Sequence, residues 1–218
     1  MDINYILHKV SIFAIPLLFA VTLHEVAHGW VARSFGDPTA ASLGRLSLNP
    51  LSHVDLMGTI LVPGFLLLVG SPFLFGWAKP VPVDARRLRN PKRDMAVVAA
   101  AGPASNLLMA VLWTGIAVLA RSGAFGQGAA AEWLYNMGEA GLFFNVLLAV
   151  FNMIPIPPLD GGRVLVGVLP AAAARSVARI EPFGFWIVIG LIMLMSRTGY
   201  SLQPVIARVM GLIVHLFV

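Results

Sequence analysis

The 218-residue sequence contains no cysteine, and only 11% of its residues are charged. Without cysteine there is no disulfide bond, thiolate metal site or cysteine nucleophile, so any metal must be bound by nitrogen and oxygen. The low charge accompanies 58% hydrophobic residues and a mean hydropathy of +0.84, values outside the usual range for a soluble domain. The apolar residues are spread along the chain, unlike a single removable signal peptide. The composition therefore predicts an integral membrane protein.

Positive charge is concentrated in one short stretch. Six of the fifteen Lys and Arg residues lie in 79–93, between apolar segments, whereas residues 122–138 contain none. This asymmetry is typical of a cytoplasmic loop beside a bilayer, and it explains much of the net charge of +5 without a nucleic-acid partner. We therefore expect a protein of a bacterial-type plasma membrane whose 79–93 loop faces the cytoplasm.

Long apolar runs predict the membrane-spanning helices. The first run ends near Arg33, and two more cover about 95–120 and 134–155, each long enough to cross a bilayer. Two shorter stretches within 183–218 flank Arg197, which fits either a helical pair or one span plus an interfacial helix. The expected fold is an all-α polytopic membrane protein of four to six helices, formed by a single domain over residues 1–218.

Two segments depart from this helical pattern. Residues 57–76 are apolar but interrupted by several Gly and Pro residues, which predicts a re-entrant hairpin rather than a straight span. Residues 39–50 alternate leucines with small or polar residues and end at a proline, which resembles a short β-strand near the active site. The alternative for this second segment is a loop packed on the bilayer surface.

The sequence HEVAH at 24–28 is the strongest chemical signal. Four residues make about one helical turn, so His24 and His28 share one face and can bind one metal, with Glu25 beside them as general base. A carboxylate at mid-membrane costs about 2.5–3.5 kcal/mol, so such a residue normally has a function. The alternative is a hydrogen-bonded polar cluster at a helix end near the interface, where burial costs less.

Asp160 is the candidate third ligand, because a catalytic zinc site usually has three protein ligands and one open position. It follows a run of prolines at the end of the apolar run 134–155 and precedes Gly161 and Gly162. Prolines cannot continue the helix and glycines permit unusual backbone angles, so the chain should unwind around this carboxylate. The alternative is an ordinary helix exit with a capping aspartate.

Topology provides a separate test of this ligand set. Residues 24–28 and Asp160 each occur late in their apolar runs. If 57–76 only dips into the membrane, the first run and the 134–155 run both point toward the cytoplasm, and the ligands meet on that side. If 57–76 crossed completely, the two ligand sets would approach from opposite faces of the membrane.

Three motifs resemble those of the site-2 protease family of intramembrane zinc metalloproteases, in the same order and spacing. They are HEVAH at 24–28, AGPASN at 101–106 and NMIPIPPLDGG at 152–162. The resemblance implies one zinc ion per chain, bound by His24, His28 and Asp160, with Glu25 activating water. It also implies cleavage of single-span membrane proteins that another protease has already trimmed. The chain resembles the compact bacterial branch, without PDZ or nucleotide-sensing domains.

The same resemblance suggests that Asn106 and Asn152 lie near the metal and hold the substrate backbone or stabilise a developing oxyanion. Their alternative is interhelical hydrogen bonding, typically worth about 0.6 kcal/mol in a bilayer. His53 and Asp55 offer a second possible metal contact, although a polar loop is the preferred interpretation. The sequence GWAKPVPV at 76–83 also resembles the compact bacterial branch of the family, but no chemical role follows from it.

Two other functions remain as alternatives. A metal transporter would use HEVAH as a transit site but would need further ionisable residues along the membrane, and the apolar runs contain almost none. A catalytically silent family member would bind membrane proteins without cutting them. The presence of Glu25 argues against this alternative. The sequence does not specify the substrate, the trigger of cleavage or the oligomeric state.

Overall fold

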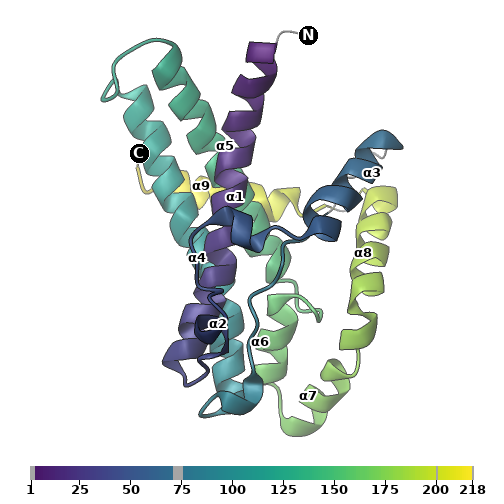
Figure 1. The fold of residues 1–218 in the computed structure, drawn as a ribbon. Helices are drawn as coiled ribbons and strands as arrows, with labels where there is room; N and C mark the ends of the chain where they lie inside the picture. The colour runs from purple at the N-terminus through teal and green to yellow at the C-terminus, as the bar shows by residue number, and fades with distance from the viewer. Residues whose placement is uncertain (1–2, 71–75, 200, 218) are drawn as a thin grey trace.

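The computed structural model describes residues 3–70, 76–199 and 201–217, and within these ranges the chain is helical without a β-strand. Three long helices form the central bundle: α1 (Ile3–Ser34), α4 (Pro91–Arg121) and α5 (Ala129–Asn152). They contain 32, 31 and 24 residues, enough to cross about 30 Å of hydrocarbon. Figure 1 shows them side by side along most of their length.

The contact between α4 and α5 depends on small residues. Trp113 of α4 is buried, and its indole lies directly against Gly141 of α5, where a Cβ atom would overlap the ring. Gly138 lies against the α4 backbone, and a Cβ built on it would be only 2.8 Å from the Trp113 carbonyl oxygen. Small residues allow such close approach in membranes, where packing rather than water exclusion holds helices together.

The C-terminal helices surround this bundle. Helix α9 (Gln203–Val214) crosses α4 and α5, burying Ile206 and Ile213 against them. Helices α6 (Asp160–Val168) and α7 (Ala171–Ala178) lie at the end where α4 begins, and α8 (Gly184–Thr198) stands beside the bundle (Figure 1).

Four helical stretches of the described chain are long and apolar enough to span a membrane. They are Leu7–Ser34, Pro91–Arg121, Ala129–Asn152 and Ala171–Met195. The predicted all-α membrane fold is therefore confirmed, at the lower end of the expected helix number. The first, second and third stretches coincide with the three long apolar runs of the sequence.

The predicted β-strand within residues 39–50 is wrong. Residues 39–42 form the short helix α2 (Thr39–Ser42), and 43–49 are irregular up to the 3₁₀-helix η1 (Pro50–His53). The described part of the chain offers no second strand, so the backbone here bonds to side chains instead. The Ser47 carbonyl oxygen, for example, lies 2.8 Å from His53 Nε2, and the Asn49 amide donates to Ser47 Oγ at 3.1 Å.

The re-entrant hairpin predicted for 57–76 is not supported. Six residues of π-helix, η2 (Leu56–Leu61), run into seven residues of α-helix, α3 (Val62–Leu68), and residues 71–75 lie outside the described ranges. The helix begins here because the Asp55 carboxylate accepts a hydrogen bond from the Gly58 amide at 2.7 Å. The combined stretch is shorter than the roughly 20 residues of a spanning helix.

Candidate metal centre

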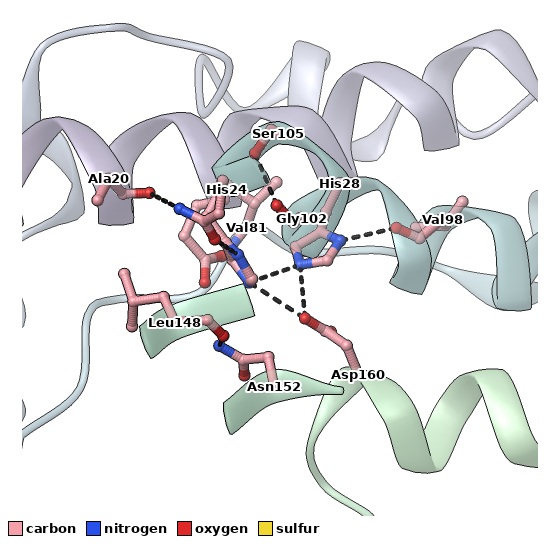
Figure 2. A network of polar contacts seen from close by, with 12 residues as sticks. Ala20, His24, His28, Val81, Val98, Gly102, Ser105, Leu148, Asn152 and Asp160 are labelled. Carbon is pink, nitrogen blue, oxygen red and sulfur yellow. Dashed lines mark hydrogen bonds and ion pairs between the residues drawn. The ribbon is translucent and has the colours of Figure 1, made fainter. Parts of the chain in front are cut away.

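Three ligand atoms converge where α1 meets the start of α6. His24 and His28 project from α1, and Asp160 is the first residue of α6 (Figure 2). The Asp160 Oδ2 atom lies 3.1 Å from His24 Nε2 and 3.4 Å from His28 Nε2, and the two Nε2 atoms are 3.1 Å apart. The structure thus brings together the three residues predicted as metal ligands, and they form the one such group found among the described residues.

The size of this triangle suits zinc. Zinc binds imidazole nitrogen and carboxylate oxygen at about 2.0–2.2 Å, which separates tetrahedral ligands by about 3.3–3.5 Å. The observed separations of 3.1, 3.1 and 3.4 Å lie within about 0.3 Å of that range. No large movement of either helix is needed to accommodate the ion.

The hydrogen bonds around the triangle also favour a bound cation. His28 Nδ1 lies 2.7 Å from the Val98 carbonyl oxygen, and His24 Nδ1 lies 2.6 Å from Asn106 Oδ1. Both partners are acceptors, so each Nδ1 carries the proton and each Nε2 presents a lone pair. Asp160 Oδ2 is buried and accepts no hydrogen bond among the described residues. With both histidines neutral, three electron-rich atoms face one another, an arrangement that a bound cation would stabilise.

Gly102 forms the wall behind the two imidazoles. A Cβ atom built on this residue would lie 2.5 Å from His28 Nε2 and 2.6 Å from His24 Cε1. Any other residue would push the histidines out of their positions. The AGPASN motif at 101–106 therefore contributes space for the candidate ligands through its glycine.

Asp160 reaches the site because the chain leaves its helix at Asn152 and re-enters a helix at Asp160. The prediction of unusual backbone angles at Gly161 and Gly162 is wrong, since both lie in the first turn of α6 and neither has a positive φ. Their role is steric: a Cβ on either would overlap the backbone of the preceding loop.

Glu25 faces an irregular segment, residues 77–83, that crosses over the site. Its Oε2 atom accepts a hydrogen bond of 2.7 Å from the Val81 amide. The same segment is tied down by the amide of Trp77, which donates to Gly58 at 3.0 Å, and the amide of Lys79, which donates to His53 at 2.9 Å. One carboxylate oxygen of Glu25 is thus fixed.

The two asparagines suggested by the family resemblance lie in different surroundings. The Asn106 side chain is completely buried, and its Nδ2 donates to the Ala20 carbonyl oxygen and to Asn145 Oδ1, so neither amide proton is free. Asn152, the last residue of α5, donates to the Leu148 carbonyl oxygen at 3.0 Å and lies next to Asp160 (Figure 2). The occupied amide of Asn106 favours a positioning role, whereas a substrate contact stays a prediction for Asn152.

His53 and Asp55 do not join the metal ligands in the described structure. His53 is buried, and its Nε2 lies 2.8 Å from the Ser47 carbonyl oxygen. Asp55 caps the following helix. Both stabilise the segment between α2 and α3, in agreement with the preferred interpretation of a polar loop.

Sequence reasoning missed three contributors to the site. Val81 acts through its backbone amide, which no side-chain pattern reveals. Gly102 was noticed only as part of a motif. Asn145 is the one polar side chain within residues 140–151 of α5, and the rarity of such residues in membranes was the available signal.

Comparison with known proteins adds a separate line of argument. The sequence profile of peptidase family M50 matches residues 12–123 and 121–196. The chain is 35% identical to the Bacillus subtilis protein named "Putative zinc metalloprotease YwhC" over 98% of this chain and 94% of that one. It is 33% identical to the Rip2 protein of Mycolicibacterium smegmatis, which bears the same description, over 80% of this chain and 64% of Rip2. No solved structure was found to match.

Proposed function

This chain belongs to peptidase family M50, the site-2 protease family, and we propose that it is an intramembrane protease that hydrolyses peptide bonds in or near the transmembrane segments of other membrane proteins. The observation that carries the proposal is the convergence of His24, His28 and Asp160 within a bundle of membrane-spanning length. A soluble substrate would not require such a site to be built into spanning helices.

The chain supplies the parts that peptide hydrolysis needs. One zinc ion, held by His24, His28 and Asp160, would act as a Lewis acid on the scissile carbonyl and make a water molecule more acidic. Glu25 takes the proton from that water and delivers it to the leaving amine. The Val81 amide holds one oxygen of Glu25 and leaves the other for proton transfer.

The distribution of charge supports an active site that opens toward the cytoplasm. Arg86 and Arg87 lie just before α4, and Arg163, Arg175 and Arg179 lie in or next to α6 and α7, at the same end of the bundle in Figure 1. The loop between α4 and α5 lies at the other end and has no Lys or Arg after Arg121. The basic end is the cytoplasmic one under the positive-inside rule.

The proposed substrates are single-span membrane proteins that have already lost their extracytoplasmic part. A transmembrane helix hides its carbonyl groups in hydrogen bonds, so it must unwind locally before water can attack. Substrates with Gly or Pro near the cleavage position should therefore be cut faster. The bilayer itself is the second partner, and the plasma membrane of a bacterial cell is the proposed location.

Zinc content and proteolysis, measured on the same detergent-purified samples, test this function. We expect wild type to bind one equivalent of zinc and to cut a single-span membrane protein, and His24→Ala and Asp160→Ala to lose both properties. Glu25→Gln should keep the zinc and cleave about 10²–10⁴-fold more slowly, because only proton transfer is removed.

The same samples separate the alternatives. A catalytically silent binding protein would retain its biological activity with Glu25→Gln. A transporter would move zinc into sealed vesicles, which a protease would not do. Full cleavage by Glu25→Gln would disprove the proposed mechanism.

A further inference from the structure

Two buried asparagines lie behind His24, on the side away from the ligand triangle. Asn106 of α4 and Asn145 of α5 are both fully inaccessible to solvent. Asn145 Nδ2 donates to the Gly141 carbonyl oxygen at 2.8 Å, and Asn145 Oδ1 accepts from Asn106 Nδ2 at 2.9 Å. Asn106 Oδ1 in turn lies 2.6 Å from His24 Nδ1. A continuous chain of hydrogen bonds thus runs from the α5 backbone to the histidine.

The chain of hydrogen bonds has only one direction. The Gly141 carbonyl can only accept, so the Nδ2 group of Asn145 must face it and Oδ1 must face Asn106. Ala20 O and Asn145 Oδ1 then take both protons of Asn106 Nδ2, at 3.0 and 2.9 Å. Asn106 can offer His24 only an acceptor, and His24 Nδ1 must donate to it. The lone pair of His24 is therefore on Nε2, toward the metal.

We propose that Asn145 is a positioning residue for zinc binding, which acts through Asn106 to fix the tautomer of His24. This inference rests on the proposed zinc site. His28 needs no such relay, because its Nδ1 bonds directly to the Val98 carbonyl oxygen, a group that cannot rotate or donate. The two histidines of the motif are thus held by different means, and only His24 depends on an amide whose orientation must itself be fixed.

Loss of Asn145 leaves the Ala20 carbonyl oxygen as the one described acceptor that holds the Asn106 amide in this orientation, so turning the amide over costs less free energy. With one of its two acceptors gone, Asn106 can present Nδ2 to His24 and stabilise the tautomer that carries a proton on Nε2. That tautomer has no lone pair on Nε2, the atom that faces the other two ligands, and cannot bind the metal there. Because partners of metal-bound histidines typically change metal affinity 10–100-fold, we expect this more distant residue to change it by about tenfold.

The test compares Asn145→Leu with Thr114→Val in the full-length protein in detergent. Both substitutions keep the shape of a buried polar side chain and remove its hydrogen bonds, but Thr114 bonds only to Ala110 within α4. Zinc affinity is measured by competition with a chelator, and folding is monitored by thermal unfolding. We expect about tenfold weaker zinc binding for Asn145→Leu and unchanged binding for Thr114→Val. Equal zinc affinity in wild type and Asn145→Leu would overturn the inference.

A double substitution distinguishes positioning from general destabilisation. In the Asn106→Asp background the carboxylate accepts from His24 in either orientation, so nothing remains for Asn145 to orient. Asn145→Leu should then cause no further loss of zinc affinity. A tenfold loss in both backgrounds would overturn the inference even with zinc bound by wild type. Failure of wild type to bind zinc would instead overturn the proposed function, and the inference with it.

Discussion

The two sides of the candidate site are built in different ways. On the metal side, the ligands and their hydrogen-bonding partners, other than Asp160 itself, lie on the long helices α1, α4 and α5, and bonds to backbone carbonyls anchor them. On the base side, Glu25 is held by one amide of the irregular 77–83 segment. Substitutions on the metal side should therefore remove zinc, and substitutions on the base side should slow cleavage while zinc remains bound.

Gly102→Ala should produce the largest effect on the metal side. The new methyl group would overlap both imidazoles, and α4 cannot retreat because it packs along both α1 and α5. We expect zinc affinity to fall at least about 100-fold, toward the upper end of the effects known for groups that orient metal ligands. Chelator competition measures the loss.

Gly115→Ala is the matched control for that substitution. This residue lies on the same helix, and the nearest atoms a Cβ would meet belong to Phe217, at 3.5 Å, an ordinary contact distance. We expect normal zinc affinity from this variant. Normal affinity from Gly102→Ala as well would mean that the histidines can move without losing the metal.

Val81→Pro should produce an intermediate effect on the base side. Proline removes the amide that holds Glu25 but suits the extended segment, in which Pro80 and Pro82 already flank the position. We expect cleavage to slow about 10–100-fold because the base loses its fixed orientation, with zinc content unchanged. A kinetic assay beside zinc analysis tests both parts.

Val81→Ala is the control, because it keeps the amide and should cleave at nearly the normal rate. Faster cleavage by Val81→Pro would show that the 77–83 segment restrains Glu25 rather than orienting it. Loss of zinc would show that the two sides of the site are not separable.

The same contrast explains what the sequence could predict. His24 and His28 share a helix face by spacing alone, and Asp160 was the candidate oxygen ligand at the right depth, so the group that the structure brings together could be predicted without a structure. The amide of Val81 could not, since any residue except proline provides one. The strand expected within 39–50 was wrong because alternation indicates a strand only where a partner strand exists to complete the hydrogen bonds.

His53→Ala should produce the smallest effect on the site and tests the suggestion that this residue binds a second metal. His53 is 2% exposed and bonds to Ser47 O, so its removal leaves a partly buried carbonyl unpaired, at a cost toward the lower end of about 1–3 kcal/mol. Thermal unfolding should therefore occur at lower temperature. Zinc stoichiometry should stay at one per chain, because the histidine belongs to the segment that supports residues 77–83 and not to the ligand triangle. If His53→Ala lost zinc while α1 stayed folded, His53 would contribute to zinc binding. The segment around His53 and the ligand triangle would then not be separate sites.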